Sequence, residues 1–132
     1  MRHCLGFTLL LSLAVSCANN VRPHVQAGEA HMDEIYSLGV WRIKEGRQAD
    51  FIAAWKDLGA IFASLPRPPA GQGLLIQSTT EPTLFYSFGP WHSLEDVAAM
   101  RGDPRAQDAI SRLRELCTDA TPGSFRVVAE SQ

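Results

Sequence analysis

The stretch EIYSLGVWRI at residues 34–43 decides the fold class, because its β-branched and aromatic residues favour a strand and Gly46 follows at a turn. Successive side chains of a strand point to opposite faces of the sheet. Here both faces are apolar, since Tyr36, Leu38 and Val40 share one face and the other carries Ile35, Trp41 and Ile43. A strand of this kind needs a covering layer on both sides.

A second two-faced strand is predicted at residues 84–88, where Leu84, Tyr86 and Phe88 oppose Phe85. It follows a shorter predicted strand at Leu74–Ser78 and a turn at Glu81-Pro82. The two strands therefore form a hairpin.

Between the first strand and this hairpin, the apolar period becomes that of a helix. From Gln48 onward the apolar residues recur at spacings of four, three and four until Pro66 stops the helix; they are Phe51, Trp55, Leu58 and Phe62. We expect this face to pack on the sheet.

Two helical segments are predicted after the hairpin. Ser93 and Asp96 make a capping-box-like start for a short helix that runs to Met100. Asp103-Pro104 then restarts the helix with a cap and a proline at the first helical position. The apolar stripe of this last helix is predicted to consist of Ala106, Ile110, Leu113 and Cys117.

Pro122-Gly123 is predicted to end the following connection, and Phe125–Ala129 supplies the fourth strand. The order βαββαβ predicts an α+β fold of the ferredoxin-like kind, a four-stranded antiparallel sheet with its helices on one face. Helices on one face leave the other uncovered, and we expect Trp41 and Ile43 to lie there. A second copy would cover that apolar surface, which predicts a face-to-face homodimer.

The composition fits one globular domain at residues 33–130 of the 132-residue chain, with 45% hydrophobic and 20% charged residues. The net charge of −2 comes without a Lys/Arg cluster. Nucleic acid is therefore not an expected partner.

The N-terminus allows two interpretations. Residues 1–17 resemble a signal peptide, with an apolar run at Leu5–Val15 that ends near Cys17, the position of lipidation in a bacterial lipoprotein box. Residues 18–32 would then be a flexible tether, and the protein would be exported and anchored to a membrane through Cys17. Alternatively, translation begins at Met32 and the protein is cytoplasmic.

No resident cofactor is expected. The three cysteines and four histidines show no metal-ligand spacing. Gly71-x-Gly73 lies between a proline-rich loop and a strand rather than opening a helix, so it does not match a dinucleotide-binding loop.

Trp91-x-Ser93-x-Glu95 at the end of the third strand, followed by Asp103-Pro104, resembles the antibiotic biosynthesis monooxygenase family over nearly all of residues 33–130. The resemblance implies a dimeric α/β barrel whose pocket, between sheet and helices, holds a small aromatic molecule such as a polycyclic phenol or quinol. It also implies a reaction with O₂ that uses no flavin or metal, because the substrate supplies the electrons.

The candidate site residues follow from that expectation. His92 is the only imidazole inside the domain and is the candidate catalytic proton acceptor, although a solvated surface histidine is the simpler interpretation. Trp41 and Trp91 could stack on a flat ligand or belong to the core. The polar strand residues that could bind the substrate are Tyr36, Ser37, Gln77, Tyr86 and Ser87. Cys117 is expected to be a buried, inert thiol.

Two other functions were considered for this fold. Haem degradation, the activity of a neighbouring branch of the superfamily, is disfavoured because its Asn, Trp and His positions fall near Gly39, Met100 and Ile110. A non-catalytic small-molecule-binding or interaction protein on the same dimeric scaffold stays open beside the oxygenase.

Overall fold

A computed structural model describes residues 31–132. The predicted signal peptide with Cys17, and residues 18–30 of the predicted tether, lie outside the described residues. The elements in chain order are β1 (Ile35–Ile43), α1 (Gln48–Ala63), β2 (Leu74–Gln77), β3 (Leu84–Trp91), α2 (Leu94–Gly102), α3 (Pro104–Glu115) and β4 (Cys117–Arg126).

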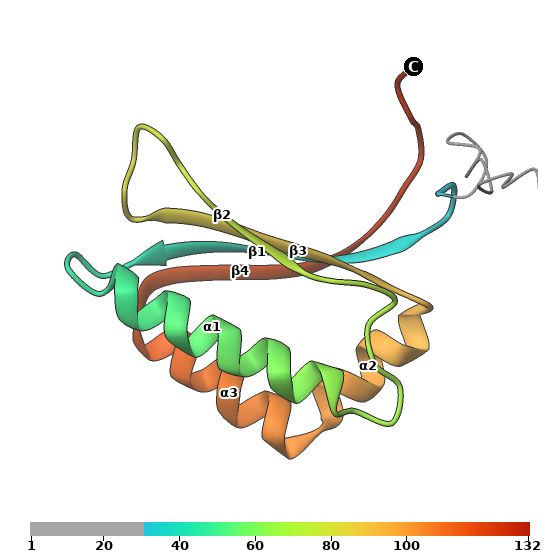
Figure 1. The fold of residues 1–132 in the computed structure, drawn as a ribbon, viewed down its shortest axis with the longest axis horizontal. Coiled ribbons are helices and arrows are strands. Elements are labelled where there is room, and N and C mark those ends of the chain that lie inside the picture. Colours follow the sequence, from blue (N-terminus) through green and yellow to red (C-terminus); the bar gives the residue numbers. More distant parts are fainter. Residues whose placement is uncertain (1–30) are drawn as a thin grey trace, which may run out of the picture.

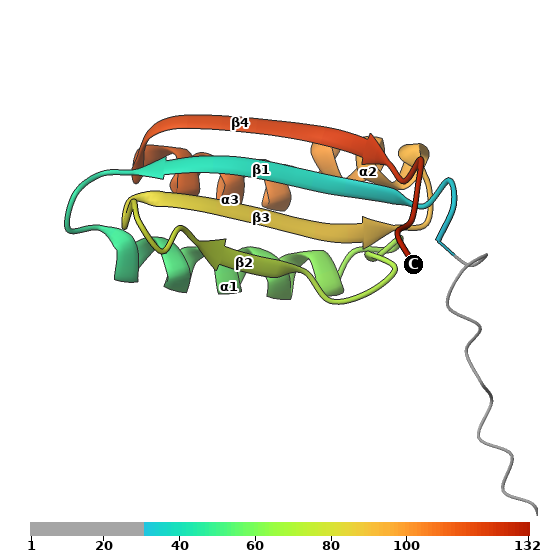
Figure 2. The same ribbon diagram turned by 90° about the horizontal axis from the view of Figure 1, so that it is seen from above.

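The strands form one antiparallel sheet in the order β2-β3-β1-β4, with all three helices on the same face (Figures 1 and 2). β1 lies in the middle, so Leu38 pairs with Phe88 of β3 and with Gly123 of β4. This is the ferredoxin-like α+β arrangement predicted from the sequence. In residues 31–132, no helix combines the length and the apolar character needed to cross a membrane.

The helix starts confirm the predicted caps. The Ser93 hydroxyl accepts a hydrogen bond from the Asp96 amide at 3.1 Å, and α2 begins at the next residue. The Asp103 carboxylate accepts from the Arg105 amide at 2.8 Å, while Pro104 occupies the start of α3. Because the two caps lie ten residues apart, α2 and α3 are separate helices that pack against the sheet in different places.

The core lies between the sheet and the helices. One cluster is built around Trp41, Ile43, Phe51, Phe85 and Leu113, and a second contains Ile35, Leu65, Trp91, Val97, Met100 and Ala106. The expectation that Trp41 and Ile43 lie on the uncovered face was wrong, because both are buried under the helices. The apolar stripe of α1, with Phe51 fully buried, needs large apolar partners on the face it covers.

The fourth strand was placed wrongly from the sequence. β4 begins at Cys117, which was assigned to the last helix, and runs through Pro122 and Gly123, which were assigned to a connection. β4 is an edge strand that pairs only with β1, so a proline without an N–H is tolerated where no further strand needs that hydrogen bond.

The open face of the sheet is apolar. It carries the side chains that alternate with the buried ones, among them Leu38, Val40 and Phe88. Four large residues on it are substantially exposed: Leu74 at 51%, Ile76 at 51%, Tyr86 at 39% and Phe125 at 53%. All three helices lie on the other side of the sheet, and no helix covers this face (Figure 2).

Candidate functional site: a cavity above a floor of glycine and serine

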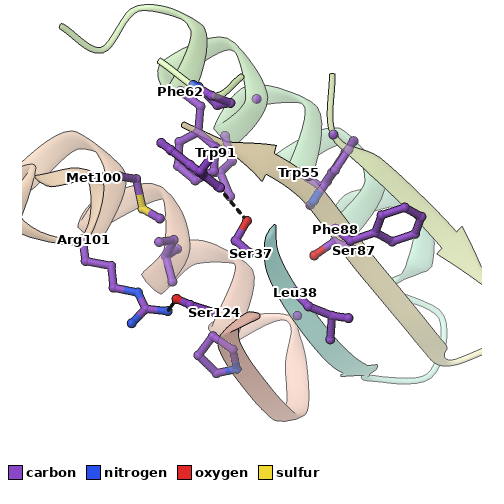
Figure 3. A pocket seen from close by; sticks show the side chains of 18 of the residues that line it. Ser37, Leu38, Trp55, Phe62, Ser87, Phe88, Trp91, Met100, Arg101 and Ser124 are labelled. Atoms are coloured by element: carbon purple, nitrogen blue, oxygen red, sulfur yellow. Dashed lines mark hydrogen bonds between the residues drawn. The ribbon is translucent and has the colours of Figure 1, made fainter. Parts of the chain in front are cut away.

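A cavity of about 980 Å³ lies on the helix side of the sheet. Its lining comes from β1, β3 and β4, from all three helices, and from residues 68–73 of the loop that leads into β2 (Figure 3). Ligand sites typically measure roughly 300 to 1,000 Å³. The space is therefore sufficient for a polycyclic molecule.

Small residues on two neighbouring rows of the sheet create this space. Ser37 pairs with Gly89 on one side and with Ser124 on the other, and in the next row Gly39 pairs with Ser87. Directly paired residues of antiparallel strands point to the same face, so all five face the helices. The helices rest on the larger side chains around these rows, so the cavity lies above the rows, except over Gly39, where the Trp41 indole lies.

These five residues, Ser37, Gly39, Ser87, Gly89 and Ser124, form the floor of the cavity. Two tryptophans form reciprocal hydrogen bonds with serines of this floor. Trp41 of β1 donates from Nε1 to the Ser87 hydroxyl of β3 at 2.8 Å. Trp91 of β3 donates from Nε1 to the Ser37 hydroxyl of β1 at 2.9 Å (Figure 3). Both indoles are nearly buried, with exposed fractions of 5% and 2%, so these bonds satisfy donors that water cannot reach.

The reciprocity has a simple origin in the sequence. Ser37-Leu38-Gly39-Val40-Trp41 and Ser87-Phe88-Gly89-Pro90-Trp91 share the pattern Ser-x-Gly-x-Trp, and the two stretches lie antiparallel beside each other. Each tryptophan therefore reaches the serine of the opposite stretch. This repeated pattern was the available signal for the floor, and the sequence-based prediction missed it.

Glycine is required at the centre of at least the first pattern. A Cβ on Gly39 would lie 2.6 Å from Nε1 of Trp41 and 2.7 Å from its Cε2. A Cβ on Gly89 would lie 3.1 Å from the Cα of Gly73, which is tight but less severe. The indole of Trp41 thus lies across its own strand only because Gly39 has no side chain.

Aromatic and apolar side chains form the walls of the cavity. Trp55 and Phe62 come from α1, Met100 from α2 and Ile110 from α3. The Phe62 ring meets the Trp91 indole edge-on, with ring centroids 5.4 Å apart. Flat aromatic ligands fit such surfaces through stacking and edge contacts.

The charged part of the lining is cationic. Lys56, Arg101 and Arg114 line the cavity, and the lining contains no aspartate or glutamate. Arg101 donates from Nη2 to the Ser124 hydroxyl at 3.1 Å (Figure 3). None of the three cations forms an ion pair within residues 31–132.

The structure brings together four of the predicted site residues, since Ser37, Trp41, Ser87 and Trp91 all line the cavity. The others lie elsewhere. The Tyr36 hydroxyl donates to the Glu34 carboxylate at 3.5 Å, and burial, aided by this carboxylate, raises the pKa of the phenol. Gln77 donates to the Pro82 carbonyl at 2.8 Å outside the cavity.

Tyr86 and His92 also lie outside the lining. Tyr86 is on the open face of the sheet, and His92 is exposed between the end of β3 and the Ser93 cap. The catalytic role of His92 stays a prediction, one that the cavity geometry does not support. Arg101, Arg114 and Trp55 are lining residues that the sequence did not single out as part of a site.

Neither the cysteine nor the acidic residues form a recognisable metal site in the described part of the chain, where no three His, Cys, Asp or Glu side chains cluster. The Cys117 thiol donates to the Leu113 carbonyl at 3.2 Å. Burial raises the pKa of this thiol, which favours its unreactive protonated form.

No protein-family model and no curated protein sequence matches this chain. Solved structures do match. The cofactor-independent oxygenase SnoaB from Streptomyces nogalater, as its N63A mutant, is 19% identical with a TM-score of 0.64, over 76% of this chain and 96% of SnoaB.

Two proteins provisionally described as antibiotic biosynthesis monooxygenases match similarly. The one from Bordetella bronchiseptica is 16% identical with a TM-score of 0.64, over 74% of this chain and 100% of that one. The one from Deinococcus radiodurans is 15% identical with a TM-score of 0.63, over 74% and 96%. Likeness at these identities concerns the fold, and at that level it confirms the resemblance predicted from the sequence: this chain has the monooxygenase-like fold of the antibiotic biosynthesis monooxygenases.

Proposed function

We propose that this protein binds a small aromatic molecule of the quinol or polyketide type in the cavity above the glycine and serine floor, and oxidises it with O₂ without a resident flavin, haem or metal. The observation that carries the proposal is the cavity itself, which combines a ligand-sized volume, walls of Trp55 and Phe62, and hydroxyl groups on the floor. The fold shared with SnoaB, a cofactor-independent oxygenase, supports it.

The chemistry that fits this lining is stabilisation of an oxyanion. A phenol or quinol must lose a proton before it can pass electrons to O₂, and hydrogen-bond donors around its oxygen favour the ionised form. Ser37 and Ser87 can supply such donors from the floor, and the cations of the lining add favourable charge. The aromatic walls hold the ring flat and exclude water from the anion.

An anthrone, the keto form of a polycyclic phenol, gives a balanced example in which a ring methylene becomes a carbonyl. One atom of O₂ enters the substrate, the other leaves as water with the two hydrogens of the methylene, and all electrons come from the substrate. The residues of the lining would position the anion and O₂ and would undergo no redox change themselves.

Oxygen uptake tests the proposal. Protein treated with a chelator and freed of flavin would be mixed with a panel of anthrones and naphthoquinols, and uptake and product formation would be recorded. We expect turnover above the uncatalysed rate, and we expect a Ser37→Ala, Ser87→Ala double variant to lose about a hundredfold of it, the scale of one missing oxyanion donor. No reaction with any member of the panel would contradict the oxygenase proposal.

A non-catalytic binding protein on the same scaffold is the second candidate. The observation that favours it is that no imidazole or carboxylate lines the cavity within residues 31–132, so the lining offers no conventional general base. Binding of a naphthoquinol or anthrone with micromolar affinity and without any oxygen uptake would support this candidate over the first.

We also propose that two copies associate through the open face of the sheet. A contiguous apolar surface that includes Leu74, Ile76, Tyr86 and Phe125 is larger than the isolated exposed apolar residues common on monomers. Two such sheets can pack face to face and bury their strand side chains against each other. The glycine and serine residues of the floor and the helix side chains that line the cavity lie away from the open face, so association would leave the cavity accessible.

A further inference from the structure

The charge of the cavity lining is opposite to that of the chain. The whole sequence has 14 acidic and 12 basic residues, but the lining contains Lys56, Arg101 and Arg114 and not one carboxylate. The acidic side chains of the described residues point elsewhere, and none of them pairs with these three cations. The cations are therefore free to interact with a bound molecule.

The hydroxyl groups of the cavity also favour a ligand that accepts hydrogen bonds. Three of its four serines already accept a hydrogen bond: Ser37 from Trp91, Ser87 from Trp41 and Ser124 from Arg101. Indole and guanidinium N–H groups can only donate, so in each pair the serine must be the acceptor. Each of these hydroxyls keeps its O–H hydrogen to donate to a ligand acceptor, while one of its two lone pairs is already in use.

Other polar lining groups do not reverse this bias. Trp55 adds an indole N–H that has no partner within residues 31–132, and an indole cannot accept. Gln72, Gln107 and Ser111 are neutral groups that can donate or accept. A ligand with a positive charge would be repelled by the three cations, and a ligand rich in hydrogen-bond donors would meet fewer free acceptors than an acceptor-rich ligand meets free donors.

From these two observations we infer that the cavity selects an aromatic ligand that carries an ionised oxygen group, a carboxylate or a phenolate, over its neutral analogue. The inference rests on the proposed function for the aromatic nature of the ligand and adds its charge. The aromatic walls would hold the ring, while the cations of the lining, which come from three different helices, would attract the anion. Charge-assisted hydrogen bonds from cations to carboxylates are stronger than neutral ones, so they discriminate between the two ligand forms.

A matched pair of probes tests the inference. Anthraquinone-2-carboxylate and anthraquinone-2-carboxamide have the same ring system and nearly the same shape but differ in charge. Quenching of tryptophan fluorescence would measure both affinities, since Trp41, Trp55 and Trp91 line the cavity. An exposed ion pair contributes about a two- to fivefold gain in affinity, so three cations should favour the carboxylate by roughly tenfold or more at low salt.

Variants that remove one positive charge each show which cations cause the preference for the carboxylate. Lys56→Gln, Arg101→Gln and Arg114→Gln should each reduce the preference two- to fivefold, by the same reasoning, and the triple variant should remove most of it. Arg112→Gln is the matched control, because Arg112 is exposed on the same helix as Arg114 but does not line the cavity. Added salt should weaken the carboxylate affinity of the wild type and leave that of the carboxamide nearly unchanged.

Equal affinities of the wild type for the two probes, or a preference that survives in the triple variant, would overturn the inference while leaving the oxygenase proposal in place. Selective binding of the carboxylate without oxygen uptake from any quinol would have the opposite meaning, because the anion site would stand and the oxygenase would not. Binding of neither probe would contradict both the inference and the assignment of the cavity to aromatic ligands.

Discussion

Gly39→Ala is the most informative single substitution in the cavity floor. The new Cβ would lie 2.6 Å from Nε1 of the Trp41 indole, closer than such atoms can approach. The indole cannot yield easily, because it is 5% exposed, packs 5.5 Å from the Phe51 ring and donates to Ser87. We therefore expect it to be displaced and its hydrogen bond to Ser87 to break.

The expected loss of stability is the sum of three effects. Forcing a methyl group into a packed site costs about 1–3 kcal/mol, and losing the hydrogen bond costs about 0.5–1.5 kcal/mol. Alanine restricts the unfolded chain more than glycine does, which offsets about 0.4–1 kcal/mol. The free energy of unfolding should therefore fall by about 0.5–4 kcal/mol.

Urea unfolding followed by circular dichroism measures this change, and the NMR resonance of the Trp41 indole N–H reports the hydrogen bond. Gly59→Ala in α1 is the control, because a Cβ there meets no atom within 4 Å. It should stabilise the helix by about 0.5–1 kcal/mol, so the two identical chemical changes have opposite signs.

A double variant separates the two causes of the Gly39→Ala loss. In a Ser87→Ala background the hydrogen bond is already absent, so the further cost of Gly39→Ala should be smaller than in the wild type. If Gly39→Ala were as stable as the wild type and left the indole resonance of Trp41 unchanged, the indole would not depend on the missing side chain at Gly39, contrary to this prediction.

Four further outcomes are expected. Ser37→Ala should lower the free energy of unfolding by about 1–3 kcal/mol in urea titrations, because it strands the indole N–H of a tryptophan that is 2% exposed. His92→Ala should retain oxygen uptake, since the imidazole does not line the cavity; a loss of about a hundredfold would restore its predicted catalytic role. Ile76→Glu on the open face should convert a dimer to a monomer in light scattering, whereas Ala60→Glu on the helix side should not. Mass spectrometry of the membrane fraction should find a chain that begins at a lipidated Cys17, and a soluble, unmodified chain would contradict the proposed export and anchoring.

The element order and the helix starts could be predicted from local signals. Ser93 and Asp103 cap their helices as expected because a short polar side chain before an apolar helical period acts on amides only two or three residues away. The two wrong predictions, Trp41 on the uncovered face of the sheet and the bounds of β4, have a different origin. Both faces of β1 are apolar, so the pattern alone cannot show which one the helices cover, and Pro122 signals a break unless the strand is known to be an edge.

The sequence by itself determined the βαββαβ order and the two-faced sheet, because these depend on periodicity and capping over short stretches. The likeness to the monooxygenase fold came from the family resemblance of Trp91-x-Ser93-x-Glu95 and Asp103-Pro104. Only the tertiary structure decided the site. Ser37 and Ser87 are 50 positions apart, and their role depends on the register that places each beside the tryptophan of the other strand. Lys56, Arg101 and Arg114 come from three different helices, so the cationic lining exists only after those helices pack on the sheet.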